Sequence, residues 1–179
     1  MTQQDVVVAI YDTHTGAEDA IRKLQGKGID IRSLSIVGRD THTDEHAVGY
    51  YNAGDRMKYW GKAGAFWGGI WGLLFGSAFF AIPGLGPVLA AGPIVGWIVA
   101  ALEGAAVVGG MSAVSAGLYS IGIPKDSIVQ YELAIKTDKF LVMVHGTPAE
   151  VEEARVVLES TPAVSVTLHS NELVPAGAR

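Results

Sequence analysis

The chain contains no cysteine among its 179 residues. This absence excludes a disulfide framework, thiolate chemistry, and zinc or iron–sulfur sites that use cysteine ligands. Basic residues are also scarce: 13 lysines and arginines stand against 18 aspartates and glutamates, for a formal net charge of -5. Phosphate backbones are bound by clusters of lysine and arginine. The sequence has no such cluster, so nucleic acid is not an expected partner.

Charged residues are absent from one long stretch. Residues 63–102 are forty consecutive positions without Asp, Glu, Lys, Arg or His. Polar sequence flanks this stretch on both sides, which indicates two polar pieces around one apolar piece. The first five residues, MTQQD, have neither the positive start nor the apolar core of a signal peptide. We therefore do not expect the apolar stretch to be a cleaved export sequence.

Small residues recur at regular spacing through the apolar stretch of residues 59–121. Glycine or alanine occupies every fourth position in two rows, separated by a Pro-Gly-Leu-Gly-Pro break at 83–87, and an offset third row follows. A glycine inside a helix costs about 1 kcal/mol relative to alanine, so such rows favour helices whose backbones approach closely. We expect a glycine-zipper helical hairpin that turns at 83–87 and self-associates. The expected contact residues are Gly64, Gly68, Gly72, Gly76, Gly92, Gly96, Ala100, Gly104, Gly109 and Gly117.

The polar parts of the chain alternate between strand and helix patterns. Four short runs of β-branched and apolar residues predict strands at 6–11, 33–38, 140–145 and 164–168. A helix is expected after the first strand, with Thr15 as N-cap and Glu18 at the capping-box position. Another is expected after the third strand, where Thr147 is the N-cap and a proline follows it.

Without residues 40–138, the element order is β-α-β followed by β-α-β. This is the split β-α-β, or ferredoxin-like, order, and the predicted fold class is α+β with the helical hairpin as a long insertion. Loop entropy permits the insertion, because its cost grows only logarithmically with length. The predicted organisation is a discontinuous α/β head at 1–39 and 139–170, a polar linker at 40–58, the hairpin at 59–121, a short returning helix at 122–138 and a tail at 171–179.

Two blocks of sequence carry a family resemblance. Residues 82–93, IPGLGPVLAAGP, and residues 122–125, GIPK, with Tyr131 and Glu132 downstream, resemble bacterial general-stress or heat-induced stress proteins. The resemblance covers nearly the whole chain. It implies a small α/β stress domain that carries a glycine-rich apolar segment between its halves, and it brings no catalytic residues to transfer.

The apolar stretch is long enough to cross a bilayer twice. A spanning helix needs about 20 mainly apolar residues; residues 60–82 meet this length and residues 88–119 exceed it. Small residues at every fourth position are typical of helix pairs in lipid. We therefore expect membrane association with the head in the cytoplasm. The alternative is a soluble homo-oligomer with the hairpins as its apolar core, because apolar patches of this size do not stay exposed on a monomer.

Glu103 conflicts with a simple membrane span. A charge at mid-membrane costs roughly 2.5 to 3.5 kcal/mol on insertion scales. Three interpretations stay open. The second helix ends near residue 102 and Glu103 lies at the interface, Glu103 pairs with Lys62 or Lys58 across the hairpin, or the hairpin is not in lipid.

Histidines are the candidates for a metal or anion site. His42 and His46 are four residues apart with carboxylates between them, which suits a metal on a helix, but a solvated loop is favoured because spacing fixes no third ligand. His145 and His169 end two predicted strands and could be neighbours or could point apart. His14 follows the first strand and could line a small pocket with His145 at one sheet edge.

The sequence predicts no catalytic residue, metal or cofactor. Phosphate loops need a strand followed by a glycine-rich turn, whereas the glycines here run through predicted helices, and no nucleophile stands beside a base. The expected function is that of a non-enzymatic, stress-associated protein that self-assembles through its hairpin and displays α/β heads. The alternative from a different class is a regulatory module that holds a small ligand or metal.

Overall fold

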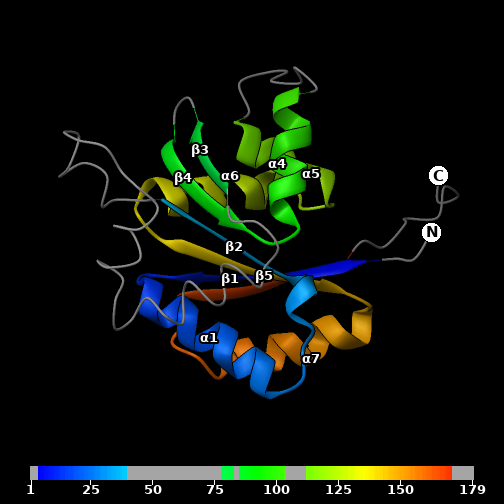
Figure 1. The fold of residues 1–179 in the computed structure, drawn as a ribbon. Coiled ribbons are helices and arrows are strands. Elements are labelled where there is room, and N and C mark those ends of the chain that lie inside the picture. The colour runs from blue at the N-terminus through cyan, green and yellow to red at the C-terminus, as the bar shows by residue number, and fades with distance from the viewer. Residues whose placement is uncertain (1–3, 40–77, 83–84, 104–111, 171–179) are drawn as a thin grey trace, which may run out of the picture.

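The computed structural model describes residues 4–39, 78–82, 85–103 and 112–170. This part of the chain is a mixed α/β structure in which helices lie on both faces of an antiparallel sheet (Figure 1). Its elements are β1 (Asp5–Tyr11), α1 (His14–Gly26), the short 3-10 helix η1 (Ile31–Ser33), β2 (Leu34–Arg39), β3 (Ala78–Ile82), β4 (Gly86–Ala91), α4 (Ile94–Glu103), α5 (Ala113–Ser120), α6 (Lys125–Lys136), β5 (Phe140–Gly146), α7 (Pro148–Glu159) and β6 (Ser165–His169).

The sheet has six strands in the order β3-β4-β2-β5-β1-β6, and every neighbouring pair is antiparallel. Strands β1, β2, β5 and β6 lie where the sequence predicts strands, so these four predictions are confirmed. The register places Val6 of β1 opposite His145 on one side and opposite His169 on the other. Strands β3 and β4 were not predicted, and they extend the sheet beyond β2.

Strand β1 is buried along its whole length, because both faces of the sheet are covered. Val7, Ala9 and Tyr11 belong to the core on the α1 and α7 side. Val6 and Val8 belong to a second core on the opposite face. Successive strand residues point to opposite faces, so an unbroken apolar run is what a strand between two cores requires.

Helices α1 and α7 cover one face of the sheet (Figure 1). Thr147 caps α7, as predicted, and forms both hydrogen bonds of a capping box with Glu150. The predicted cap of α1 is wrong: the helix begins at His14, so Thr15 lies inside its first turn. Thr13 is the N-cap instead, and its Oγ1 accepts a hydrogen bond from Gly16 N at 3.2 Å. Glu18, expected at the capping box, is buried and forms an ion pair with Arg22.

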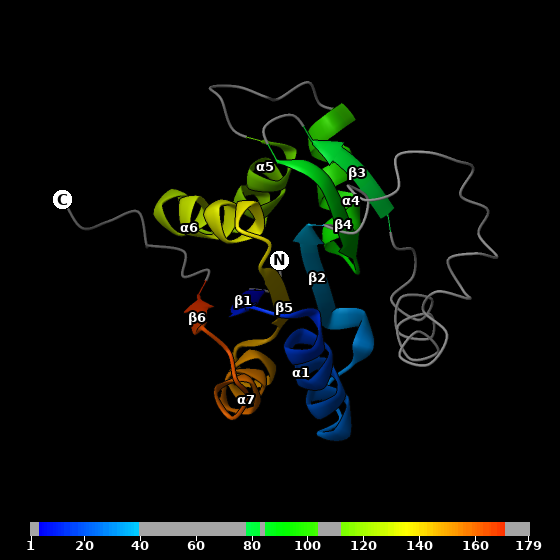
Figure 2. The ribbon, with the colours of Figure 1, turned by 90° about the vertical axis from the view of Figure 1, so that its left-hand side faces the viewer.

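Helices α4, α5 and α6 cover the other face, across the sheet from α1 and α7 (Figure 2). The core on this side joins sheet residues such as Val8 and Met143 to Ile98 of α4, Leu118 of α5 and Ile135 of α6. The described part of the insertion therefore buries many of its apolar side chains against the chain's own sheet. Those buried side chains need neither lipid nor other copies of the chain to cover them.

The helical hairpin expected over 59–121 is not what the described residues form. Strands β3 and β4 pair as antiparallel neighbours, with Leu85 N bonded to Ile82 O at 3.0 Å and Gly86 at a φ of 78°. The described residues on both sides of the predicted turn form strands and not helices. The long helix expected over 88–119 is replaced by β4, α4 and α5. Pro87 and Pro93 lack the amide protons that a continuous helix needs, and the edge of β2 offers hydrogen bonds to β4 instead.

Of the predicted helix-contact residues, Gly92 does not lie in a helix, whereas contact of Gly96 and Ala100 with another copy of the chain stays a prediction. Gly92 lies outside any helix, at a φ of 90°, between β4 and α4. Gly96 and Ala100 are exposed on α4, and a Cβ built on Gly96 would meet nothing within 4 Å. Gly117 does lie at a helix contact, because a Cβ there would be 3.5 Å from Ile98 Cγ1 of α4. The remaining predicted contact residues lie outside the described residues: Gly64, Gly68, Gly72, Gly76, Gly104 and Gly109.

Within the described ranges, no helix combines the length and apolar character needed to cross a membrane. Helix α4 has 10 residues, whereas a spanning helix needs about 20. Of the first expected span, residues 60–77 lie outside the described residues and residues 78–82 form β3. Lys62 also lies outside them, while Glu103 is the last residue of α4, so their pairing stays a prediction.

Candidate functional site

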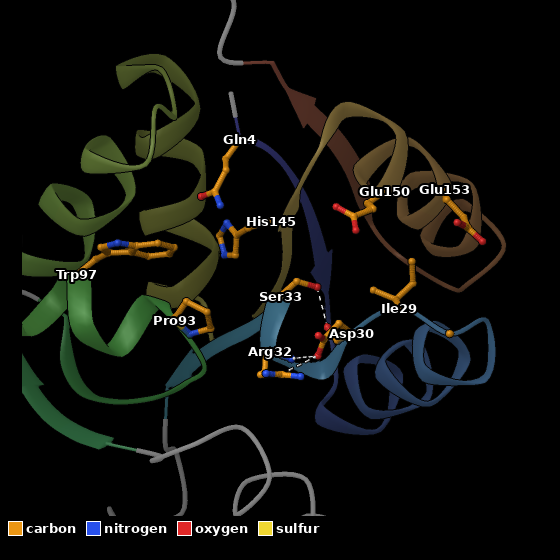
Figure 3. Close-up of a pocket in the computed structure, with 11 residues that line it drawn as sticks. Gln4, Ile29, Asp30, Arg32, Ser33, Pro93, Trp97, His145, Glu150 and Glu153 are labelled. Carbon is orange, nitrogen blue, oxygen red and sulfur yellow. Dashed lines mark hydrogen bonds and ion pairs between the residues drawn. The ribbon is translucent and has the colours of Figure 1, made fainter. Parts of the chain in front are cut away.

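A cavity of about 550 Å³ lies at the end of the sheet where β2 begins and β5 ends. Its wall comes from four parts of the chain: the start of β1, the loop between α1 and β2, the beginning of α4, and the adjoining ends of β5 and α7 (Figure 3). The lining residues are Gln4, Gly28, Ile29, Asp30, Arg32, Ser33, Pro93, Trp97, His145, Glu150 and Glu153. The predicted head and the insertion thus both contribute to this cavity.

The cavity exists because α4 begins directly against β2. A Cβ at Gly92 would lie 2.1 Å from Leu34 O, and the φ of this glycine is 90°. Only glycine combines this backbone conformation with so close an approach. Two residues later, Ile94 N donates a hydrogen bond to Ser35 Oγ at 3.3 Å. The N-terminus of α4 is therefore anchored on β2, with Trp97 one turn further along at the cavity wall.

Ser35 connects this anchor to His145, because Ser35 Oγ lies 3.2 Å from His145 Nε2. Ile94 N is a donor, so of the two described partners of Ser35 Oγ only Nε2 can accept the hydroxyl proton, and we assign the hydroxyl as the donor to Nε2. That assignment places the imidazole proton on Nδ1. The Trp97 ring packs edge-on against the imidazole, with centroids 4.9 Å apart and planes at 76°.

His145 is neutral near pH 7, because burial lowers its pKa from 6.5 to about 4. A serine beside a neutral imidazole could in principle act as a nucleophile with its base. Ser35, however, is 1% exposed, so a substrate has no access to its oxygen. The Ser35–His145 pair therefore holds β2, β5 and α4 together, and the imidazole forms part of the cavity wall.

The rim of the cavity is mainly acidic. Asp30 Oδ1 accepts from Arg32 N at 2.9 Å and lies 3.4 Å from Arg32 Nε. Hydrogen bonds from Thr147 lower the pKa of Glu150, and repulsion from Asp30 opposes that shift. Glu153 adds a third carboxylate from the next turn of α7. Across the described ranges, no group of three or more His, Asp or Glu side chains is placed to hold a metal ion.

Comparisons with protein-family models, with curated proteins and with solved structures give no match to this chain. A fold alone does not determine a function. The cavity is therefore the part of the molecule from which a function can be inferred. Its chemistry suits binding: a desolvated imidazole, an aromatic wall and carboxylates surround it, while the hydroxyl closest to a base is inaccessible.

The prediction that His14 and His145 line one pocket is wrong. His14 packs against Phe140, the first residue of β5, with ring centroids 6.3 Å apart. His145 lies near the other end of the same strand and faces the cavity. The two histidines are at opposite ends of the sheet because β1 runs antiparallel to β5.

His145 and His169 lie on the same face of the sheet, in register with Val6 between them. His169 has a separate partner, Tyr131 of α6, whose hydroxyl is 2.6 Å from Nε2. Burial raises the pKa of Tyr131 and lowers that of His169. This neutral pair ties α6 to β6, away from the cavity.

His42 and His46 lie outside the described residues, so the metal site considered there stays untested. Among the cavity residues, sequence reasoning singled out His145 and missed Trp97, Asp30 and Glu153. For Asp30 the sequence offered one indication: it lies in the loop at 28–33, and loops often carry functional residues. Trp97 gave no signal, since its place depends on how α4 packs against β2.

Proposed function

We propose that the protein is a non-enzymatic, stress-associated α/β protein that binds a small molecule in the cavity around His145. The observation that supports this proposal is the cavity of about 550 Å³ with a buried imidazole in its wall. Small-molecule sites are typically concave, about 300 to 1,000 Å³ in size, with a few polar groups among apolar ones. The association with stress rests on the resemblance of residues 82–93 and 122–125 to general-stress proteins.

In this proposal the head is a ferredoxin-like split β-α-β unit. The strand order β2-β5-β1-β6, with α1 and α7 on one face, supports that assignment. The insertion covers the second face of the head and supplies Pro93 and Trp97 to the cavity. Binding therefore requires the insertion as well as the head.

Filling the cavity tests this function. Gln4 is exposed and its side chain points toward His145 (Figure 3), so Gln4→Trp is expected to occupy the space. In a fragment screen by ligand-observed NMR, we expect several fragments to bind the wild type with about millimolar affinity, the range of small weak ligands. We expect Gln4→Trp to abolish that binding.

The matched control is Gln130→Trp, the same substitution at an exposed position of α6 that does not line the cavity. This variant is expected to bind the same fragments as the wild type. Equal binding to all three proteins would place the fragments elsewhere and contradict the proposal. A complete lack of binding to the wild type would also contradict it.

A second function is association of the chain with copies of itself. The outward face of α4 supports it, because Gly96, Val99 and Ala100 are exposed there and carry no polar group, with Val99 36% exposed. Apolar faces of this kind are often buried in assemblies. We propose homo-oligomerisation through α4; the membrane association expected from the sequence is the competing outcome.

Native mass spectrometry with and without detergent separates these outcomes. We expect a homo-oligomer in detergent-free buffer and a shift to a smaller species in Val99→Lys, because a charge on the contact face opposes burial. Val129→Lys is the control, since Val129 is 66% exposed on α6. A monomer in wild-type samples would overturn the proposal, and a protein recovered only with detergent would favour the membrane.

A further inference from the structure

We propose that the cavity selects an organic cation, an ammonium or guanidinium group attached to a planar apolar body. This inference rests on the proposed function, small-molecule binding in the cavity, and names the ligand class. Two features of the wall lead to this ligand class. They are the excess of carboxylates at the rim and the apolar surface that includes Trp97. Figure 3 shows these groups around one space.

The rim charges favour a cation over an anion. Three carboxylates line the cavity, and the guanidinium of Arg32 is held by one of them, Asp30. An anion would have to approach the remaining carboxylates of Glu150 and Glu153. Both hydrogen bonds that Thr147 gives to Glu150 use Oε2, which leaves Oε1 for a ligand. Charge-assisted hydrogen bonds to carboxylates are among the stronger polar contacts.

The wall opposite these carboxylates is apolar. Trp97 and Pro93 lie across the cavity from Glu150 and Glu153 (Figure 3). Tryptophan attracts cations through its ring face more strongly than the other aromatic residues do. The Trp97 ring also packs edge-on against the His145 imidazole. A planar apolar body can pack against this wall while its cationic group reaches the carboxylates.

His145 lies in the cavity wall without adding a positive charge to it. Its side chain is 8% exposed, and Nε2 is used by Ser35. In the described part of the chain, no buried side-chain nitrogen or oxygen lacks a partner. The proton that the assignment of the Ser35 hydroxyl as donor leaves on Nδ1 can bind an acceptor of a ligand but not its cationic group. The neutral imidazole adds no full positive charge to the cavity wall that it lines.

Isothermal titration of the full chain with three matched probes tests this selectivity. Phenethylammonium, phenethyl alcohol and 3-phenylpropionate share a phenyl ring and carry a positive, a neutral and a negative end. We expect phenethylammonium to bind about ten-fold more tightly than the alcohol, as a cation–π contact and a carboxylate pair together allow. We expect no measurable binding of 3-phenylpropionate.

Glu153→Gln tests whether the preference for phenethylammonium over phenethyl alcohol arises at the cavity. This exposed residue lines the cavity, and its substitution is expected to weaken phenethylammonium binding about three- to ten-fold while leaving the alcohol unchanged. Glu152→Gln is the matched control, because Glu152 neighbours it on α7 but pairs with Arg155 and does not line the cavity. An equal loss of phenethylammonium affinity in both variants would overturn the proposal, because it would show that the overall negative charge of the protein, and not the cavity, attracts the cation.

The probes also separate this inference from the function on which it rests. Equal affinity for the ammonium and the alcohol would overturn cation selection while leaving a ligand-binding cavity. Tighter binding of 3-phenylpropionate would overturn it in the same way. Failure of all three probes, together with the failure of the fragment screen, would remove the cavity as a binding site.

Discussion

Gly92→Ala is expected to lower the free energy of unfolding by about 3 kcal/mol or more, in the range of severe backbone and packing defects. The new Cβ would lie 2.1 Å from Leu34 O and 2.9 Å from Ser35 Cα, both backbone atoms, so α4 would have to move away from β2. The φ of 90° adds strain for any residue with a Cβ. Urea denaturation followed by circular dichroism measures the change.

Gly96→Ala is the control, made four residues further along. Gly96 lies inside α4 with open space around it, so alanine is expected to be neutral or to stabilise the protein by up to about 1 kcal/mol. The two substitutions would have similar effects if both glycines lay on one helix-contact face, as the spacing of four predicts. Equal destabilisation would therefore refute the anchoring of α4 through Gly92.

The stability of the wild type is expected to fall as the pH is lowered from about 6.5 to about 4, with His145 as a major cause. Above this window the imidazole is neutral in both states. Inside it, the unfolded chain binds a proton at an ordinary pKa of 6.5, while the folded chain resists protonation down to about 4. The unfolded state then holds more protons, so stability drops with pH, by up to about 3 kcal/mol at 1.36 kcal/mol per unit of pKa.

His145→Gln removes the titrating imidazole, and with it the contribution of His145 to the loss of stability at low pH. Denaturation at pH 7.5 and pH 4.5 is expected to show a smaller loss in the variant than in the wild type, and the comparison of the two losses is independent of any change in absolute stability. His14→Gln, at an exposed position, is the control and is expected to keep the wild-type dependence. Parallel losses in the wild type and His145→Gln would show that the imidazole is not desolvated.

The four strands β1, β2, β5 and β6 could be predicted because the residues of each segment, taken alone, form a strand pattern. Strand β1 is an unbroken apolar run, and α7 opens with a threonine cap, a proline and a glutamate, each at its required position. Strand β4 could not be found in this way. Its residues, GPVLAA, are small and apolar, and a short apolar run fits a buried strand or a helix equally well. The available edge of β2, about fifty residues away in sequence, decides between them.

The glycine spacing misled the prediction at Gly92, and it does not place Gly92 and Gly96 on one helix face. The interval of four is a helical one, yet Gly92 serves a turn at positive φ and Gly96 faces outward on α4. A repeat in sequence therefore does not establish a shared face unless the residues share an element. The candidate site shows the same limit, because Asp30, Trp97 and Glu153 come from three segments whose meeting depends on tertiary packing.

The prediction that the apolar stretch needs lipid or other copies rested on the cost of leaving it in water. The described residues offer a third solution, since Ile94, Ile98 and Leu118 are fully buried in the core with Met143 of the sheet. Self-association and membrane binding stay proposals that depend on the outward face of α4 and on segments outside the described residues.

The position of β1 in the sheet has a consequence for synthesis on the ribosome. Both of its strand partners, β5 and β6, come from the last quarter of the chain, after residue 139. The segment VVVAIY of β1 has no charge and strong β propensity, which is the composition of aggregation-prone segments. It leaves the ribosome before β5 and β6 are synthesised, so it is without these pairing partners while the intervening residues are made. Chaperone protection of the nascent chain is therefore most valuable for β1 during this interval.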